Sequence, residues 1–360
     1  MACEVGHQPD QARLRVAADT EHQQDQVEKR RPKASGRMEE PRFEEEEEPE
    51  DYEIALFRKE WDLCYAADYG PLEATTVRPM RYTFRPIPKH ATREIGLQIF
   101  SVKVAKPKED EDLHWPLHVY GLIATRDSAD LRRNLVFNRT RDNCQILTQE
   151  DPFLLLTGPS RSVVLIDPVI FEIQLKAKCE TESEDKVLNF RVLGYKQNTN
   201  FQEPPFIDKM FSHCKRSKLE FAVALLFQSI EATIVVRVFQ GSWPDHLRGR
   251  VVSRTASISH GDIVLLDSRD GRMPIGGWGD VSLPRCVVSV ESEGQLKVDV
   301  VASHVDDDNN VVAKDVVDFR PKMAGVSHGI CDLGFCKMKI SVLWSLPCYV
   351  GEEVGLQNRP

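Results

Sequence analysis

The segment Asp167–Lys178, DPVIFEIQLKAK, alternates apolar and polar residues over the full length of a β-strand. The apolar set is Val169, Phe171, Ile173, Leu175 and Ala177, and the polar set is Glu172, Gln174, Lys176 and Lys178. Successive side chains of a strand point to opposite faces of the sheet. The alternation therefore predicts a strand with one buried face and one face in water.

Segments of the same character follow one another from about residue 92 to residue 350. Examples are GLQIFSVKVAK (96–106), DIVLLDS (262–268) and FCKMKISVLWSLP (335–347). Turn signals separate such segments at Gly158–Pro159, Asp270–Gly271, Glu293–Gly294 and the polar run 305–311. About ten to twelve strands, with no ten-residue helical pattern between them, predict a mainly-β fold: an antiparallel sandwich or barrel.

One apolar run within this region is ambiguous. The first half of residues 219–239 contains FAVALLF, which also fits a helix, whereas the β-branched stretch ATIVVRV (232–238) predicts a strand.

The rest of the chain divides into an arm, a helix with a linker, and a tail. Residues 1–50 end in MEEPRFEEEEEPED (38–51) and contain few large apolar side chains, so we expect a disordered acidic arm. Residues 51–91 are predicted to hold one helix and a linker, residues 92–350 the β-rich domain, and residues 351–360 a short tail.

The helix is predicted from an apolar stripe that begins at Ile54 and continues through Phe57, Trp61, Cys64 and Tyr65. Asp51 can cap its start, and Gly70–Pro71 can end it. We expect the stripe to dock on the main domain, because a short isolated helix is marginal in water. The basic, proline-containing segment 77–93 follows, and we expect an extended linker that pairs loosely with the acidic arm rather than a nucleic-acid site.

Composition and charge exclude several classes of protein. The net charge of −9 disfavours nucleic acid as a partner, and no apolar stretch reaches the ~20 residues of a membrane span. The nine cysteines are scattered, and the first residues lack the apolar centre of a secretory signal. We therefore expect a cytoplasmic protein, with a nuclear alternative from the basic cluster Lys29–Lys33.

Several chemical motifs are present without the context that their chemistry needs. Gly325–Gly329 matches the G-x-S-x-G nucleophile elbow, but a strand-like stretch follows instead of a helix. His328, Cys331, Cys336 and Cys348 lack the paired spacing of a zinc site, and Cys336 alternates with apolar residues as a core strand residue would. Asp306–Asp308 lacks the spacing of a calcium loop and suits a solvated hairpin. We expect no catalytic residue, metal or cofactor.

Three residues are candidate contacts for a partner. Trp278 stands in the glycine-rich stretch Gly276–Gly279, which lacks the pattern of a phosphate-binding loop. Arg161 follows Gly158–Pro159 and is expected at a turn tip, either solvated or in contact with a partner. Trp243, together with Trp278, would form a sugar-stacking face if both were exposed.

The stretch from Val119-Tyr120-Gly121 through Arg126-Asp127-Ser128 resembles a plant domain of unknown function that is expanded in grasses, domain of unknown function 6598. So do LVFNRTRD (135–142), LLLTGPSR (154–161) and the final CDLGFCKMKISVLWSL (331–346). The similarity covers about Leu97 to Leu346. The resemblance implies a domain that occurs alone or beside a ribosome-inactivating N-glycosylase domain, and it implies no activity for the domain itself.

Ribosome-inactivating enzymes carry a Glu-Ala-x-x-Arg helix, which provides a test of that association. Here Glu231-Ala232 is present, but Arg237 follows the glutamate by six residues, and the β-branched residues between them disfavour a helix.

The sequence therefore favours a non-catalytic β-rich interaction module whose partner is a protein. A component related to ribosome-inactivating defence proteins and a carbohydrate-binding domain remain alternatives. The oligomeric state is open.

Overall fold

The computed structural model describes residue 49 and residues 51–76, 79–87, 91–107, 113–196, 205–258, 261–269, 272–305 and 307–347. The predicted disordered arm, residues 1–50, therefore lies outside the described residues except for Pro49. The basic cluster Lys29–Lys33, Asp306, Cys348 and the tail lie outside them as well.

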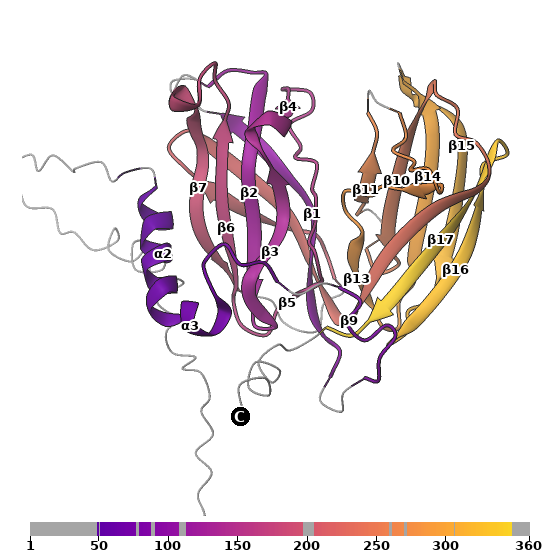
Figure 1. The fold of residues 1–360 in the computed structure, drawn as a ribbon, viewed down its shortest axis with the longest axis horizontal. Coiled ribbons are helices and arrows are strands. Elements are labelled where there is room, and N and C mark those ends of the chain that lie inside the picture. Colours follow the sequence, from indigo (N-terminus) through magenta and orange to yellow (C-terminus); the bar gives the residue numbers. More distant parts are fainter. Residues whose placement is uncertain are drawn as a thin grey trace, which may run out of the picture.

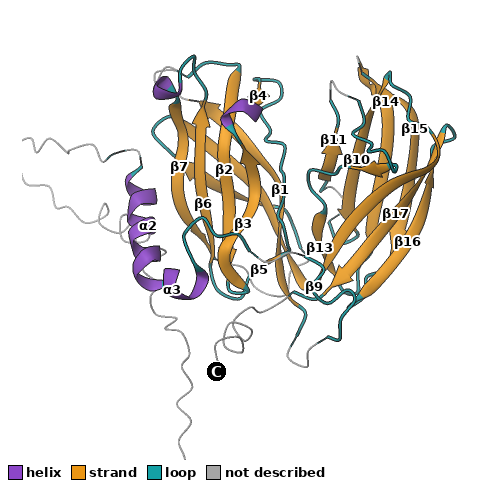
Figure 2. Ribbon diagram, viewed as in Figure 1, coloured by secondary structure: helices purple, strands orange, loops and turns teal. Residues whose placement is uncertain are grey.

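The described chain is mainly β, with strands arranged as two lobes (Figures 1 and 2). The first lobe begins with helices α2 (Tyr52–Cys64) and α3 (Ala66–Tyr69). Its strands are β1 (Glu94–Pro107), β2 (Leu117–Asp127), β3 (Asp130–Arg139), β4 (Gln145–Leu147), β5 (Val163–Val164), β6 (Val169–Ala177), β7 (Lys186–Tyr195) and β8 (Asp208–His213). Two short 3₁₀ turns lie at Arg141–Asn143 and Glu182–Glu184.

Strand β9 (Ser217–Gly241) leads from the first lobe into the second. The later strands are β10 (Leu247–Thr255), β11 (Ile263–Asp267), β12 (Asp280–Val281), β13 (Val287–Glu291), β14 (Leu296–His304), β15 (Asp307–Phe319), β16 (Gly325–Asp332) and β17 (Cys336–Ser345).

All strand pairs between these elements are antiparallel, and they form three sheets. The central sheet runs β16-β17-β9-β1-β5, with β8, β12 and β13 also paired to β9. A five-stranded sheet, β3-β2-β6-β7 with β4 on β2, belongs to the first lobe, and the four-stranded sheet β11-β10-β14-β15 belongs to the second. The sheets do not close into a barrel, so the predicted mainly-β antiparallel fold is confirmed as a pair of sandwiches.

Strand β9 contributes to both hydrophobic cores from its opposite faces. Leu219, Phe221 and Val223 belong to the core of the first lobe. Alternate residues on the other face belong to the core of the second lobe: Ala224, Leu226, Ile230, Ala232, Ile234 and Val236. The stretch FAVALLF lacks polar positions because both faces of the strand are buried there. The helical alternative for this stretch is wrong.

The opening segment forms strand β6 as predicted, but its polar face is not in water throughout. Val169, Phe171 and Ile173 are fully buried as expected. Glu172 is also fully buried, because it accepts hydrogen bonds from Arg126 (Nη2 to Oε2, 2.7 Å) and Arg133 (Nε to Oε2, 3.0 Å). Charged residues are seldom buried unless they are paired, and here two arginines supply the pairing.

Helix α2 covers this buried cluster and docks on the first lobe, as expected. Ile54 and Trp61 are buried, and the Arg126 guanidinium lies 4.3 Å from the centre of the Trp61 ring. The Glu53 carboxylate accepts a hydrogen bond from the backbone N–H of Val192 in β7 at 3.1 Å. The predicted cap by the Asp51 side chain is not made, whereas Gly70, with φ of 79°, ends the helical segment as predicted.

The segment after the helix packs against both lobes. Residues 71–76 and 79–87, here called the strap, pair with buried groups of both lobes. In the first lobe, Thr76 donates its backbone N–H to the Arg133 carbonyl at 2.9 Å. In the second, Tyr82 donates its backbone N–H to Ser345 Oγ (3.0 Å) and Thr83 Oγ1 donates to the Trp344 carbonyl (2.9 Å). Tyr82 and Thr83 are buried, so this part of the predicted linker packs against the second lobe. Its expected pairing with the acidic arm stays a prediction, because that arm lies outside the described residues except for Pro49.

Buried polar groups also join the lobes directly. Gln98 of β1 accepts a hydrogen bond from the Ser289 backbone N–H of β13 at 2.9 Å. Arg285 is buried and donates to the carbonyls of Ile99 and Phe100, and burial lowers its pKa to about 9. A Cβ at Gly96 would lie 2.4 Å from Ser229 Oγ, so a larger residue there would force the Ser229 side chain to move.

Two of the predicted turns have a different geometry from the expected one. Glu293–Gly294 does not join paired strands: β13 pairs with β9 and β14 pairs with β10 and β15, so this turn crosses from one sheet to the other. The reversal between β14 and β15 is tighter than predicted, because His304 already pairs with Asp307.

We expect Glu172→Gln to destabilise the protein by about 3–5 kcal/mol, because it leaves two buried guanidinium groups without their carboxylate. The measurement is the free energy of unfolding from denaturant titration. The matched control is Glu73→Gln, which removes a pair with Arg58 whose side chains are about half exposed; it should cost less than about 1 kcal/mol. Equal effects of the two substitutions would contradict the buried-cluster interpretation.

The wild-type contribution of Glu172 should also depend on pH. Burial raises the pKa of Glu172, but the hydrogen bonds and charges of Arg133 and Arg126 outweigh burial, so the pKa is lower than usual. Its stabilisation should be complete above the unfolded pKa of ~4.3 and decrease as the pH falls through the lower folded value. The Glu172→Gln variant should lack this decrease.

Candidate functional site

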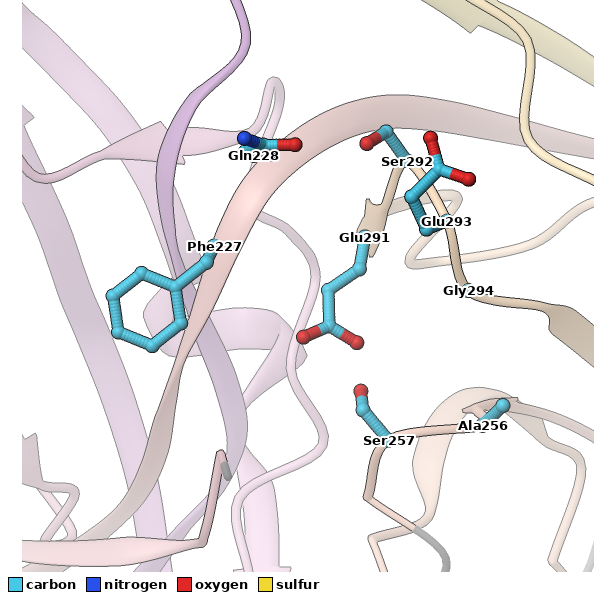
Figure 3. A pocket seen from close by; sticks show the side chains of 8 residues that line it. All are labelled: Phe227, Gln228, Ala256, Ser257, Glu291, Ser292, Glu293 and Gly294. Atoms are coloured by element: carbon cyan, nitrogen blue, oxygen red, sulfur yellow. The ribbon is translucent and has the colours of Figure 1, made fainter. Parts of the chain in front are cut away.

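A pocket of about 490 Å³ lies beside the middle of β9 (Figure 3). Its walls come from β9, from the end of β10, and from the turn between β13 and β14. The lining residues are Phe227, Gln228, Ala256, Ser257, Glu291, Ser292, Glu293 and Gly294. This volume falls in the range of small-molecule sites.

Glu291 is the titratable group that points into this pocket. Its carboxylate faces the Ser257 hydroxyl in Figure 3, and burial raises its pKa while Ser257 partly offsets the rise. The contact with Ser257 falls outside standard hydrogen-bond geometry. At the rim, Arg93 Nη1 donates to Ser292 Oγ at 3.1 Å and lies 3.9 Å from the almost fully exposed Glu293 carboxylate. The Glu291 carboxylate can accept hydrogen bonds from a small molecule that carries several donor groups, and the Phe227 ring lines the same pocket.

The outer surface of the central sheet in the second lobe is the other candidate. Large exposed apolar side chains gather on it from β9, β16 and the turn before β12: Val235 (43% exposed), Phe239 (52%), Ile330 (62%) and Trp278 (82%). We call this surface, with Arg237 and Lys339, the Trp278 face. Large apolar side chains that stand exposed near one another on a folded domain often mark an interaction site.

Two cations lie directly opposite each other at the centre of the Trp278 face. In the register of the sheet, Ile330 pairs with Lys339, and Lys339 pairs with Arg237. Arg237 lies 3.5 Å from Asp280, whereas Lys339 has no carboxylate partner among the residues that the structure describes. Like charges directly opposite across strands are destabilising, and Asp280 on the next strand offsets this repulsion for Arg237 but not for Lys339.

The turn that presents Trp278 is held against β9. The backbone carbonyl of Trp278 accepts a hydrogen bond from Arg237 Nε at 2.8 Å, and Val238 donates its N–H to the Gly279 carbonyl at 2.8 Å. Gly279 has φ of 82°, and a Cβ there would lie 2.1 Å from the Val238 carbonyl oxygen. Glycine is therefore required for the turn to lie this close to the strand. Trp278 is thus exposed, as a partner contact must be, and its role as a contact stays a prediction.

The other two predicted contact residues are not surface groups. Arg161 is 4% exposed, and its guanidinium donates to both oxygens of Asp127 at 2.6 and 2.9 Å and to Thr76 Oγ1 at 2.7 Å. The expectation of an exposed turn-tip arginine is wrong, because Arg161 is buried between the strap and β2, where its charge neutralises that of Asp127. Trp243 is half-buried: its Nε1 donates to the Leu247 carbonyl, and its ring packs at 5.5 Å against Phe335. The two tryptophans therefore do not form one exposed stacking face.

The chemical motifs lie in strands of the second lobe. The G-x-S-x-G stretch is the start of β16, paired along its length with β17, and Ser327 Oγ accepts a hydrogen bond from Trp344 Nε1 at 3.0 Å. Cys331 and Cys336 are buried in the core, as predicted for Cys336, and burial raises the pKa of the Cys331 thiol to about 12. Within the described residues, no three potential metal ligands gather, and no helix is long and apolar enough to span a membrane.

Glu231 and Arg237 both lie in strand β9, so the glycosylase-type helix is not formed. Glu231 is buried under the strap, where its carboxylate accepts hydrogen bonds from the backbone N–H groups of Met80 (2.8 Å) and Ser162 (2.9 Å). Burial raises its pKa. Arg237 is exposed on the Trp278 face.

A family model described as "Domain of unknown function (DUF6598)" matches residues 96–342. The match runs from β1 into β17 and includes both lobes and the shared strand. The chain belongs to the DUF6598 family. The predicted resemblance to this family is confirmed.

Comparison with curated proteins found no match for the DUF6598 chain. Among solved structures, the C2A and C2B domains of extended synaptotagmin 2 match at 8% identity with a TM-score of 0.25, covering 76% of this chain and 99% of that one. Human GIVD cytosolic phospholipase A2 matches at 9% identity with a TM-score of 0.21, covering 71% of this chain and 31% of that one. At TM-scores this low, the two structures do not indicate a function for this chain.

The raised pKa of Glu291 leads to a testable pH dependence. In the pH range between the unfolded pKa of ~4.3 and the raised folded pKa, the folded state holds up to one more proton at Glu291, so its contribution to stability should decrease as the pH rises. Denaturant titration at several pH values should show that Glu291→Gln removes this slope. Glu293→Gln in the same turn is exposed and should leave the slope unchanged; a loss of slope in both variants would argue against burial as its cause.

Proposed function

We propose that this DUF6598 chain is a non-catalytic protein-interaction module that binds acidic protein segments with apolar side chains through the Trp278 face. The observation that carries the proposal is the cross-strand pair Lys339–Arg237 between exposed apolar side chains. A bound carboxylate between the two cations would replace their repulsion with attraction.

The apolar members of the face support anchoring of a partner. Trp278 is a large aromatic ring with a polar N–H, and such residues carry much of the binding energy at protein interfaces. Val235 and Phe239 flank Arg237 along β9, so apolar and cationic groups alternate over a short distance. A segment with both carboxylates and apolar side chains fits this pattern better than a purely acidic one.

The rigidity of the surface supports the same function. Its residues stand on strands that are hydrogen-bonded to neighbours, and the turn of Trp278 is tied to β9. Little conformational entropy would be lost in ordering this side of the interface. The net charge of −9 over the whole chain disfavours a nucleic acid as occupant, although cations and aromatic rings are both present.

The proposal is tested with short fluorescein-labelled peptides in which carboxylate content and aromatic content vary independently. Fluorescence anisotropy with the full chain should show that peptides with both features bind more tightly than peptides with only one. The double variant R237E/K339E should weaken this binding by about tenfold or more, because two attractive contacts become repulsive.

The matched control is R250E/K297E, which reverses two partly exposed cations on the outer side of the four-stranded sheet and changes the net charge equally. It should bind the peptides as the wild type does. If both double variants weakened peptide binding equally, the effect would come from the net charge of the chain and not from the Trp278 face, and the proposal would be overturned. Preferential binding of a labelled single-stranded RNA through the same face would replace it with a nucleic-acid function.

A further inference from the structure

We propose that the acidic arm of one copy of this chain, residues 38–51, binds the Trp278 face of a second copy. This inference rests on the proposed function, since it names an occupant of the same face. The arm–face contact predicts that copies of the chain associate with one another, and that each copy folds without this association.

The arm has the chemistry that the face selects. Its sequence, MEEPRFEEEEEPED, contains nine carboxylates against the single cation Arg42, and Met38 and Phe43 supply apolar side chains next to the acidic run. Phe43 directly precedes the five consecutive glutamates Glu44–Glu48. One short segment thus offers an aromatic anchor and several carboxylates to a surface with apolar groups around two opposed cations.

The arm is tied to the wrong end of the molecule to reach its own Trp278 face. Helix α2 begins at Tyr52 and is fixed on the first lobe, where Glu53 accepts the Val192 N–H and lies 3.1 Å from Arg191. Figure 1 shows α2 at one end of the molecule and β16 and β17 at the opposite end. The acidic run is therefore attached on the far side of the first lobe.

The reach of the chain decides between binding in the same copy and binding in a second one. Glu44 precedes Tyr52 by eight residues, and a fully extended chain spans at most about 3.5 Å per residue, or about 28 Å. Figure 1 places α2 and the strands of the Trp278 face at opposite ends of the longest axis of the molecule, with the first lobe between them. The acidic run is held within about 28 Å of Tyr52 and would have to cross the whole first lobe to reach its own face, whereas the face of a second molecule can approach it directly.

Reciprocal exchange of arms would close a two-fold dimer, because each copy offers one arm and one face. An arm seated on the face would also compete with any acidic partner. Dimer formation and partner binding would then be mutually exclusive, and the chain's own concentration would regulate access to the face.

Sedimentation velocity of the full chain over a range of concentrations tests the inference. The wild type should associate as concentration rises and dissociate as salt is added, because exposed charges are screened. The arm variant E44Q/E45Q/E46Q/E47Q/E48Q and the face variant R237E/K339E should both be monomeric, and R250E/K297E should associate like the wild type. A wild type that stays monomeric, or association that survives in both variants, would overturn the proposal.

A charge exchange tests for direct contact. The variant with Glu44–Glu48 replaced by lysine and the variant R237E/K339E should each be monomeric alone, and should associate when mixed in equal amounts. Mixing restores opposite charges in both arm–face contacts, whereas an indirect effect on folding would not be restored. Two monomeric variants that do not associate on mixing contradict the proposal.

The same variants separate a failure of this inference from a failure of the proposed function. If acidic peptides bind through the Trp278 face while the full chain stays monomeric, the interaction module stands and the arm is not its occupant. If neutralising the arm strengthens peptide binding to a chain that remains monomeric, the arm acts within one molecule, and binding to a second copy is wrong. If neither peptides nor arms bind, both proposals fall.

Discussion

The alternation of side chains along a single strand determines this architecture. A β-strand has only two faces, and β9 uses one face for the first core and the other for the second, so neither sandwich is complete without the shared strand. Between Phe221 and Leu226 both faces are buried at once, which explains the continuous apolar run in that part of the chain. The two lobes therefore share one strand, and the family match over 96–342 includes strands of both of them.

Contacts outside the shared strand hold the two lobes in a fixed relation. The strap carries hydrogen bonds from Arg133 in the first lobe to Ser345 and Trp344 in the second, and it covers the buried Glu231 carboxylate on the way. Arg161 and Asp127 anchor the start of the strap through Thr76. Buried charges of this kind contribute little net stability but are costly to break, so they specify one arrangement of the segment more than they strengthen it.

The sequence predicts the class of fold well and the buried charges poorly. Period-two alternation identifies β6 because it is a local property that the sheet context preserves. The same rule places Glu172 on the face in water, and the turn signal Gly158–Pro159 places Arg161 at an exposed turn tip, since a charged residue in a local pattern is expected to be exposed. Their partners, Arg126 and Asp127, stand 46 and 34 residues away, and no local pattern reports a pairing at that separation.

The shared strand β9 was ambiguous for a related reason. At 25 residues it is much longer than an ordinary strand, and burial of both its faces removes the alternation of apolar and polar residues by which a strand is identified.

The Trp278 face follows from the same geometry that builds the two cores. The side of β9 that carries Phe221 is covered by the five-stranded sheet, and further along the strap covers Glu231 on that side. Beyond this point the described chain supplies no further layer, and Val235, Arg237 and Phe239 stand on an uncovered continuation of a surface that is buried elsewhere.

An outward face in water would be expected to carry polar residues and paired charges. The exposed apolar side chains depart from the first rule, and Lys339, which has no carboxylate partner among the described residues, departs from the second. Such departures from local consistency are expected where a protein gives up stability for function. An acidic segment that carries apolar side chains would remove both departures, and this is the physical reason for assigning the binding function to this part of the sheet.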